Sequence, residues 1–179
     1  MQFTDTHSHL YVSDYDSDRR EAVDRAISSG VTRMILPNVD VQSIAPMRAM
    51  QAQWPDNTRM AMGLHPTETG DDLTALNAVL KELETNRQDY VAIGEIGMDL
   101  YWDKSREDLQ MQVFERQIAK AVELDLPIII HNREALDQTI EVLEPYSGRV
   151  RGVFHCFGGT QADVEAVRRR AGDFYFGIG

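Results

Sequence analysis

Short apolar segments that resemble strands alternate with helix-like segments along the whole of this chain. We expect strands at residues 2–6, 31–36, 60–64, 91–94, 127–130, 150–154 and 174–178. The helices between them are expected at residues 17–29, 41–53, 71–85, 105–124, 133–143 and 161–170, where apolar residues recur at spacings of three and four. Because apolar strands joined by helical crossovers form parallel sheets covered by helices, this order predicts an α/β protein.

The number of repeats narrows the α/β class to one architecture. Seven strands and six helices, without a shift in composition, predict a (β/α)8 TIM barrel in a single domain over residues 1–179. A complete barrel has eight of each in about 250 residues, so strand eight is missing from this sequence. We therefore expect an incomplete barrel, which is a truncated chain, a fragment or a natural short form.

The net charge and the cysteine content limit the binding partners and the cellular compartment expected for this chain. The formal net charge of −11 argues against sequence-independent coating of duplex DNA. The single cysteine, Cys156, excludes an internal disulfide and indicates a cytoplasmic protein, and we expect this thiol to be buried and inert. Neither a signal peptide nor a membrane-spanning segment is predicted, and no obligate protein partner is evident.

All five histidines of the chain directly follow predicted strands. His7 and His9 are spaced i, i+2, so on an extended backbone both imidazoles point to the same side. The other strand ends carry His65, Glu95, His131 and His155. Because the carboxyl ends of the strands form the catalytic face of a barrel, we expect these side chains to converge there.

Imidazole and carboxylate ligands together indicate a divalent-metal site. They suit Zn²⁺, Mn²⁺ and Co²⁺ and tolerate Mg²⁺. Glu95 has two oxygens and can bridge two ions roughly 3.5–4 Å apart. We assign His7 and His9 to one ion, and His131 and His155 to the other. Two such ions acidify a bound water and stabilise charge on a phosphoryl or acyl oxygen.

Several sequence blocks resemble the TatD family of metal-dependent deoxyribonucleases, TIM barrels of the amidohydrolase superfamily. The matching blocks are residues 5–10, 63–66, 94–99, 127–133, 152–159 and 176–179. The resemblance implies hydrolysis of nucleic-acid phosphodiesters, commonly as a 3′-to-5′ exonuclease on single strands. The metal ligands that it implies are His7, His9, Glu95, His131 and His155, with Glu95 also catalytic. The family takes a further aspartate from strand eight, which this sequence does not contain.

Three more polar residues are candidates for substrate binding. The resemblance suggests that His65 contacts a substrate phosphate; the alternative is a turn histidine stiffened by Pro66. Arg133 either grips a phosphate bidentately or forms a salt bridge at a helix start. Asp99 orients a ligand, lines the cleft or only orders the loop that follows it.

The loop after Asp99 also carries two aromatic residues, Tyr101 and Trp102. They either stack on bases or pack the loop. Our leading hypothesis is a hydrolase that cleaves phosphodiester bonds in single-stranded DNA. The alternatives are an ester or amide hydrolase, such as a D-aminoacyl-tRNA deacylase, and an inactive barrel fragment.

Overall fold

The computed structural model describes residues 1–178. Its strands are β1 (Phe3–Asp5), β2 (Val31–Pro37), β3 (Thr58–Ala61), β4 (Tyr90–Asp99), β5 (Ile128–Arg133), β6 (Gly152–Phe154) and β7 (Tyr175–Phe176). Its α-helices are α1 (Arg19–Ser28), α2 (Ile44–Gln53), α3 (Thr74–Thr85), α4 (Glu107–Leu124), α5 (Leu136–Leu143) and α6 (Gln161–Arg170). Short 3₁₀ helices are η1 (Ser13–Tyr15), η2 (Pro66–Glu68), η3 (Arg87–Asp89) and η4 (Glu144–Tyr146).

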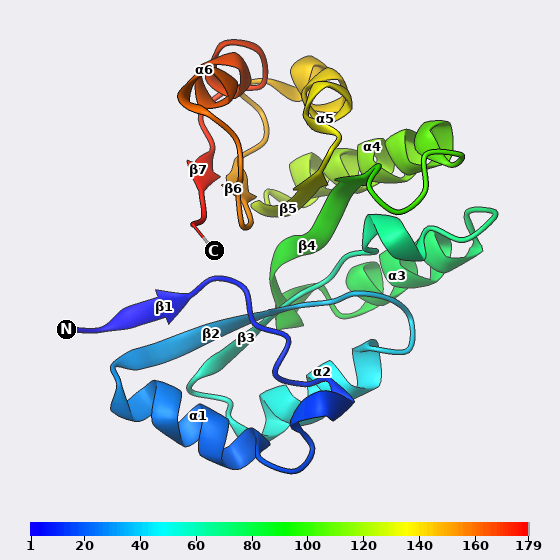
Figure 1. Ribbon diagram of the computed structural model, residues 1–179. Coiled ribbons are helices and arrows are strands. Elements are labelled where there is room, and N and C mark those ends of the chain that lie inside the picture. The colour runs from blue at the N-terminus through cyan, green and yellow to red at the C-terminus, as the bar shows by residue number, and fades with distance from the viewer. Residues whose placement is uncertain (179) are drawn as a thin grey trace.

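The seven strands form one sheet in sequence order, and every neighbouring pair is parallel. Figure 1 shows this sheet curled into an open barrel with the helices on its outer side. Strands β1 and β7 are the two free edges and lie on either side of the gap. The prediction of an incomplete α/β barrel is therefore confirmed for residues 1–178.

Helix α4 anchors the centre of the sheet. Its apolar face is buried, with Val113, Phe114 and Ile118 each at most 2% exposed. Two buried glutamines on the same helix bind backbone at strand ends. The Gln117 side chain accepts a hydrogen bond from the Leu64 N–H and donates to the Leu64 carbonyl, and Gln110 does the same for Asp99. These amides satisfy backbone groups where the sheet ladder ends.

Strands β4 and β5 are longer than expected, and this corrects the position of four site residues. Glu95 and Asp99 lie within β4, and His131 and Arg133 lie within β5, rather than after the strands. The helix expected from residue 133 therefore begins only at Leu136. The parallel ladder continues as far as the pairing of Asp99 with Arg133, because the polar side chains along it find partners and do not need water.

Strand β3 begins and ends earlier than expected, at Thr58 and Ala61, so His65 lies in the loop after it rather than directly at its end. The remaining boundaries differ by at most three residues. The edge strands β1 and β7 are shorter than expected, since each has only one neighbour to pair with. Helices α1 to α4 begin two or three residues later than expected, as at Thr74, whose N–H donates to the side chain of Asp72. Thr160 caps α6 in a capping box with Asp163.

Gly97 allows β4 and β5 to approach closely at the level of the site. Its φ of +143° lies in a region that L side chains rarely adopt. A Cβ at this position would overlap the carbonyl oxygen of His131 on the neighbouring strand. Only glycine therefore fits here without separating the two strands.

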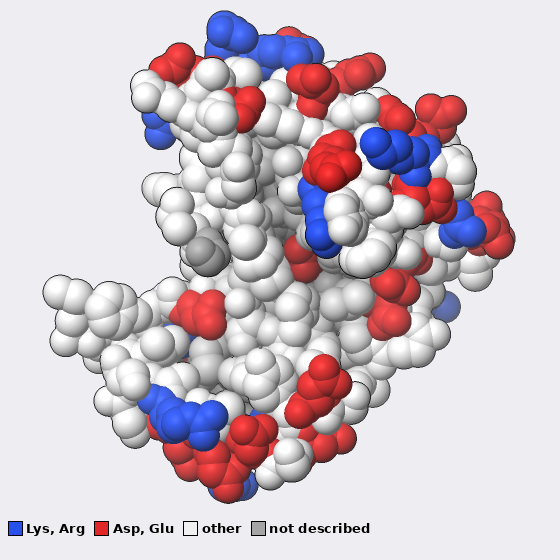
Figure 2. All heavy atoms as spheres, in the orientation of Figure 1, with Lys and Arg blue, Asp and Glu red and all other residues white. Residues whose placement is uncertain are grey.

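The inner face of the barrel carries a small apolar layer. Ala61, Ala92 and Ile129 form it, with Ile35 and Val153 packed at its sides. A groove of about 590 Å³ runs beside this layer from the end of β1 to β7. Figure 2 shows the molecule hollowed at this gap. The apolar interior is thus open on the side where the two edge strands do not meet.

Among residues 1–178, none of the helices combines the length and the apolar character needed to cross a bilayer. The cytoplasmic location and the assignment of residues 1–179 to one domain stay predictions.

Candidate metal centre

Glu95 lies at the centre of a cluster of histidines. Its side chain is 4% exposed, and its two oxygens face different neighbours. Oε2 lies 3.1 Å from Nε2 of His7 and 3.4 Å from Nε2 of His9. Oε1 lies 3.0 Å from Nδ1 of His131 and 3.7 Å from Nε2 of His65. One carboxylate thus joins two sets of potential metal ligands, each with two histidines.

The composition of the second set differs from the one we assigned. His65, from the loop after β3, accompanies His131 beside Glu95. His155 belongs to neither set but stacks on His7, with ring centroids 3.4 Å apart. Its ring therefore borders the first set, and the assignment of His155 to a metal stays a prediction.

The protonation states suit a metal site. Burial alone would raise the pKa of Glu95, but its contacts with His131, His7 and His9 outweigh the effect of burial and hold that pKa far below its usual range. Burial lowers the pKa of His65 and of His155 to about 4. Near neutral pH the carboxylate is therefore ionised and these two imidazoles are neutral, which are the forms that bind metal ions.

Asp99 connects His131 to the aromatic loop that follows β4. Its Oδ2 lies 2.8 Å from Nε2 of His131, and its Oδ1 accepts hydrogen bonds from the N–H groups of Tyr101 and Trp102. Burial would lower the pKa of His131, but its contacts with Glu95 and Asp99 raise it above the usual value. Asp99 therefore both orients a candidate ligand and orders the loop.

Tyr11 orients His9 and was missed by the sequence analysis. The buried Tyr11 hydroxyl donates to the carbonyl of Pro37, and its oxygen lies 2.9 Å from Nδ1 of His9. Because the carbonyl can only accept, the hydroxyl oxygen accepts the Nδ1 proton of His9, and the Nε2 lone pair is left facing Glu95. The signal in the sequence was the spacing of His7, His9 and Tyr11, each two residues apart.

Asn38 is a second residue that the sequence analysis missed. It is fully buried at the end of β2, and its carbonyl accepts a hydrogen bond of 3.0 Å from the N–H of Glu95. Its side-chain amide donates to the carbonyls of Gly63 and Asp40. Asn38 thereby fixes the backbone that carries Glu95, and its position just after an apolar strand was the available signal.

The cluster fits a divalent cation. Nε2 of His7 and Nε2 of His9 lie only 2.8 Å apart, and both face the same oxygen of Glu95. Three donor atoms that converge in this way suit a cation between them. Nδ1 of His7 is buried and has no hydrogen-bond partner within residues 1–178. The imidazole and carboxylate donors match the borderline metals expected from the sequence.

A cavity of about 930 Å³ opens beside the cluster. Its walls come from the segments 131–138 and 155–159, with Asp163. His131, His155 and Arg133 all line it, so it gives access to the candidate metal centre. Cys156 also lines it and is exposed, so the expectation of a buried cysteine was wrong. Cys156 has a φ of +45°, at the turn that ends β6.

A family model described as TatD related DNase matches residues 4–179. The chain belongs to the TatD family. It is 40% identical over 176 residues to an uncharacterized metal-dependent hydrolase, YabD, of Bacillus subtilis, covering 98% of this chain and 68% of that protein. It is 34% identical to a protein of Pantoea vagans named 3′-5′ ssDNA/RNA exonuclease TatD, covering 88% of this chain and 61% of that protein.

The fold of this chain is similar to that of a solved TatD structure. The crystal structure of the TatD homologue YjjV from Escherichia coli superposes with a TM-score of 0.85 at 27% identity, covering 97% of this chain and 66% of that one. The chain thus spans about two thirds of the length of these TatD relatives. Family membership, which the sequence blocks predicted, is thus confirmed, and the Bacillus subtilis relative is named a metal-dependent hydrolase.

Proposed function

We propose that this chain carries the metal centre of a phosphodiesterase that acts on single-stranded DNA with two divalent cations. One observation carries the proposal: the buried Glu95 directs each of its oxygens to a separate pair of histidines. A carboxylate shared in this way is the arrangement of two-metal hydrolases. The name of the Pantoea vagans relative supports single-stranded nucleic acid as the substrate.

Each residue of the cluster has a distinct task. His7 and His9 would hold one cation with Oε2 of Glu95, and His131 would hold the other with Oε1. His65 belongs to the second set beside His131 and would complete its coordination or contact the phosphate. His155 borders the first set through its stacking on His7 and would do the same there. When bound, the cations would supply an activated water and polarise the scissile phosphate.

The side chains beyond the cluster position the substrate. Arg133 lines the cavity next to His131, where its guanidinium can bind a phosphate oxygen pair. Asp99 holds His131 from the side opposite Glu95, which keeps the imidazole plane fixed between two carboxylates. Tyr11 holds His9 in the tautomer that presents Nε2. These contacts hold the ligands in place before substrate arrives.

The test is hydrolysis of a single-stranded oligodeoxynucleotide in Mg²⁺, Mn²⁺, Zn²⁺ or Co²⁺, alongside an aminoacyl ester. We expect cleavage of the oligonucleotide by the native chain and its loss in Glu95→Gln, together with loss of bound metal measured by elemental analysis. Glu144→Gln is the matched control, because Glu144 is an exposed carboxylate paired with Arg170 away from the cluster. Full activity in Glu95→Gln would overturn the mechanism, and cleavage of the ester alone would overturn the substrate.

A further inference from the structure

We propose that Tyr101, Trp102 and Arg133 form a nucleobase-binding subsite at the mouth of the site, where Trp102 stacks on a base of the bound strand. This inference rests on the proposed function, since it names where a single strand is gripped. The three residues come from two neighbouring segments, the loop after β4 and the end of β5.

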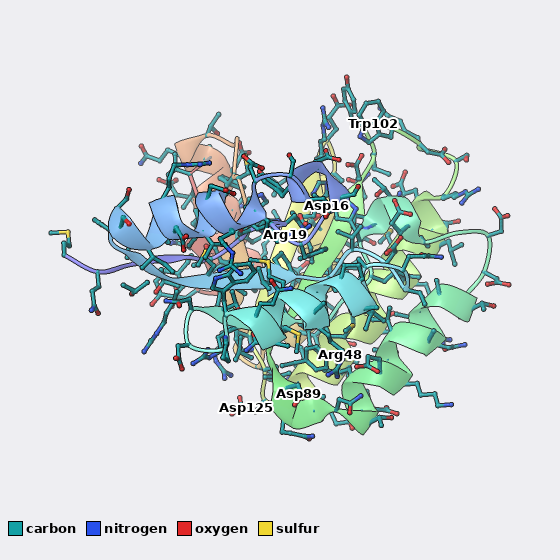
Figure 3. The ribbon with its side chains drawn as sticks, turned by 90° about the horizontal axis from the view of Figure 1, so that it is seen from below. Asp16, Arg19, Arg48, Asp89, Trp102 and Asp125 are labelled. Carbon is teal, nitrogen blue, oxygen red and sulfur yellow. The ribbon has the colours of Figure 1, made fainter. Side chains whose placement is uncertain are left out.

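Both aromatic rings of the loop after β4 are exposed to solvent. Tyr101 is 46% exposed and Trp102 is 69% exposed. Figure 3 shows Trp102 at the outer side of the molecule, far in this view from the Arg48 and Asp89 pair. The rings meet edge to face, with centroids 4.7 Å apart, so one face of the indole is not covered by Tyr101. Such a surface is costly in water and suits a stacking partner.

The loop does not depend on these rings for its conformation. The N–H groups of Tyr101 and Trp102 both donate to Asp99, and the next turn is closed by the N–H and hydroxyl of Ser105, which donate to Asp103. Backbone hydrogen bonds to carboxylates therefore shape the loop. Packing of the loop, the alternative that the sequence left open, does not account for the exposed indole.

Arg133 links the rings to the metal centre. Its guanidinium carbon lies 3.7 Å from the centroid of Tyr101 and 5.3 Å from that of Trp102. None of the arginine ion pairs within residues 1–178 involves Arg133, so the salt bridge considered from the sequence is absent there. Because the guanidinium packs on the aromatic rings through its planar face, the N–H groups at its edge stay available to bind a phosphate.

Arg133 lies between the candidate metal centre and the two rings. In the parallel ladder of β4 and β5, the backbone of Arg133 lies opposite the backbone of Asp99. The Asp99 side chain in turn contacts His131 of the candidate metal centre. A phosphate bound at the edge of Arg133 would therefore lie between the metal centre and the exposed rings. The base attached to that nucleotide would reach Trp102, and every base offers a face for stacking, so the subsite would tolerate any sequence.

The first experiment detects the base without hydrolysis. Trp54 is the other tryptophan, so Trp54→Phe leaves Trp102 as the only indole reporter. In metal-free buffer this variant is titrated with deoxyadenosine 5′-phosphate and, separately, with deoxyribose 5-phosphate. We expect saturable quenching of Trp102 fluorescence by the nucleotide and none by the sugar phosphate. Equal responses to the two, or no response to either, would overturn the subsite.

The second experiment uses catalysis and does not depend on Trp54→Phe folding. In Trp102→Ala we expect KM for a single-stranded oligonucleotide to rise about tenfold, with kcat within about twofold of the native value, while an oligonucleotide with abasic 3′-terminal positions is cleaved equally by both proteins. The control is Tyr175→Ala, which removes an exposed aromatic ring from β7. A KM unchanged in Trp102→Ala, or raised equally for the abasic strand, would contradict the proposal. If no substrate is hydrolysed the proposed function fails, and the fluorescence titration still decides the subsite.

Discussion

The central strands and the edge strands of this sheet differ sharply, although both carry the candidate metal centre. Nine of the ten residues of β4 are buried, whereas all three residues of β1 are exposed. Glu95 and His131 come from the buried centre, while His7 and His9 follow the exposed β1. One set of ligands is thus built on a packed scaffold and the other on an edge. The difference indicates that the centre is preassembled only in part.

The open groove explains why the edges are weakly held. Strands β1 and β7 each have one neighbour, and the apolar layer between them is open to solvent. Unpaired strand edges and exposed apolar surface lower local stability and favour opening. The histidines after β1 are therefore held mainly by contacts with Glu95 and Tyr11 rather than by packing of the strand itself.

The largest expected difference between the centre and the edge is in how much the free energy of unfolding falls when an aromatic side chain is truncated to alanine. Phe114→Ala empties a fully buried position on α4, against β4, and should lower the free energy of unfolding by about 3–5 kcal/mol. Tyr175→Ala on β7 removes a ring that is 81% exposed and should change it by less than about 0.5 kcal/mol. Urea unfolding of both variants measures the two values. Equal losses would remove the distinction between centre and edge.

Metal binding should act mainly on the edge. A cation at about 100 times its Kd stabilises the chain by about 2.7 kcal/mol. Because β4 is already packed, we expect amide exchange to slow most in the segment from β1 to Tyr11, as measured by mass spectrometry with and without Mn²⁺. Glu95→Gln should abolish this protection. If amide exchange slowed equally in all strands, metal binding would stabilise the edge no more than the centre.

Removing the hydroxyl that orients His9 should weaken metal binding. Tyr11→Phe leaves Nδ1 of His9 without its acceptor, and partners of this kind typically contribute about 10- to 100-fold in metal affinity. Calorimetric titration with Mn²⁺ or Zn²⁺ measures the change. Tyr15→Phe, which alters an exposed ring of η1, is the matched control. An affinity unchanged in Tyr11→Phe would mean that other contacts fix the imidazole.

The smallest expected effect concerns the helix beside the edge strand β7. Thr160→Ala removes the side-chain cap of α6 and should cost about 1 kcal/mol. Asp163 loses the hydrogen bond from the hydroxyl and keeps the one from the backbone N–H of residue 160. We therefore expect only the first turn of the helix to fray, which thermal unfolding followed by circular dichroism detects. A cost as large as that of Phe114→Ala would place α6 in the packed scaffold rather than at its edge.

The sequence predicted the barrel and the gathering of its histidines for the same reason, since parallel strands present their carboxyl ends on one side. It could not predict where β4 and β5 end, because Glu95 and His131 are polar residues that remain in the ladder. It also could not pair His65 with His131, since that pairing depends on how the loop after β3 folds over the strand ends. Tyr11 was missed because a tyrosine beside a histidine carries no metal signal of its own.

Gly97 has a consequence for how this site tolerates change. Metal ligands must keep their distances to within about 0.2 Å. Two candidate ligands, Glu95 and His131, lie on neighbouring strands that approach closely because residue 97 has no side chain. A single methyl group at residue 97 would act as a wedge, splaying the strands by more than that tolerance while the rest of the barrel stays folded. The precision of the candidate centre thus depends on the absence of a side chain at residue 97.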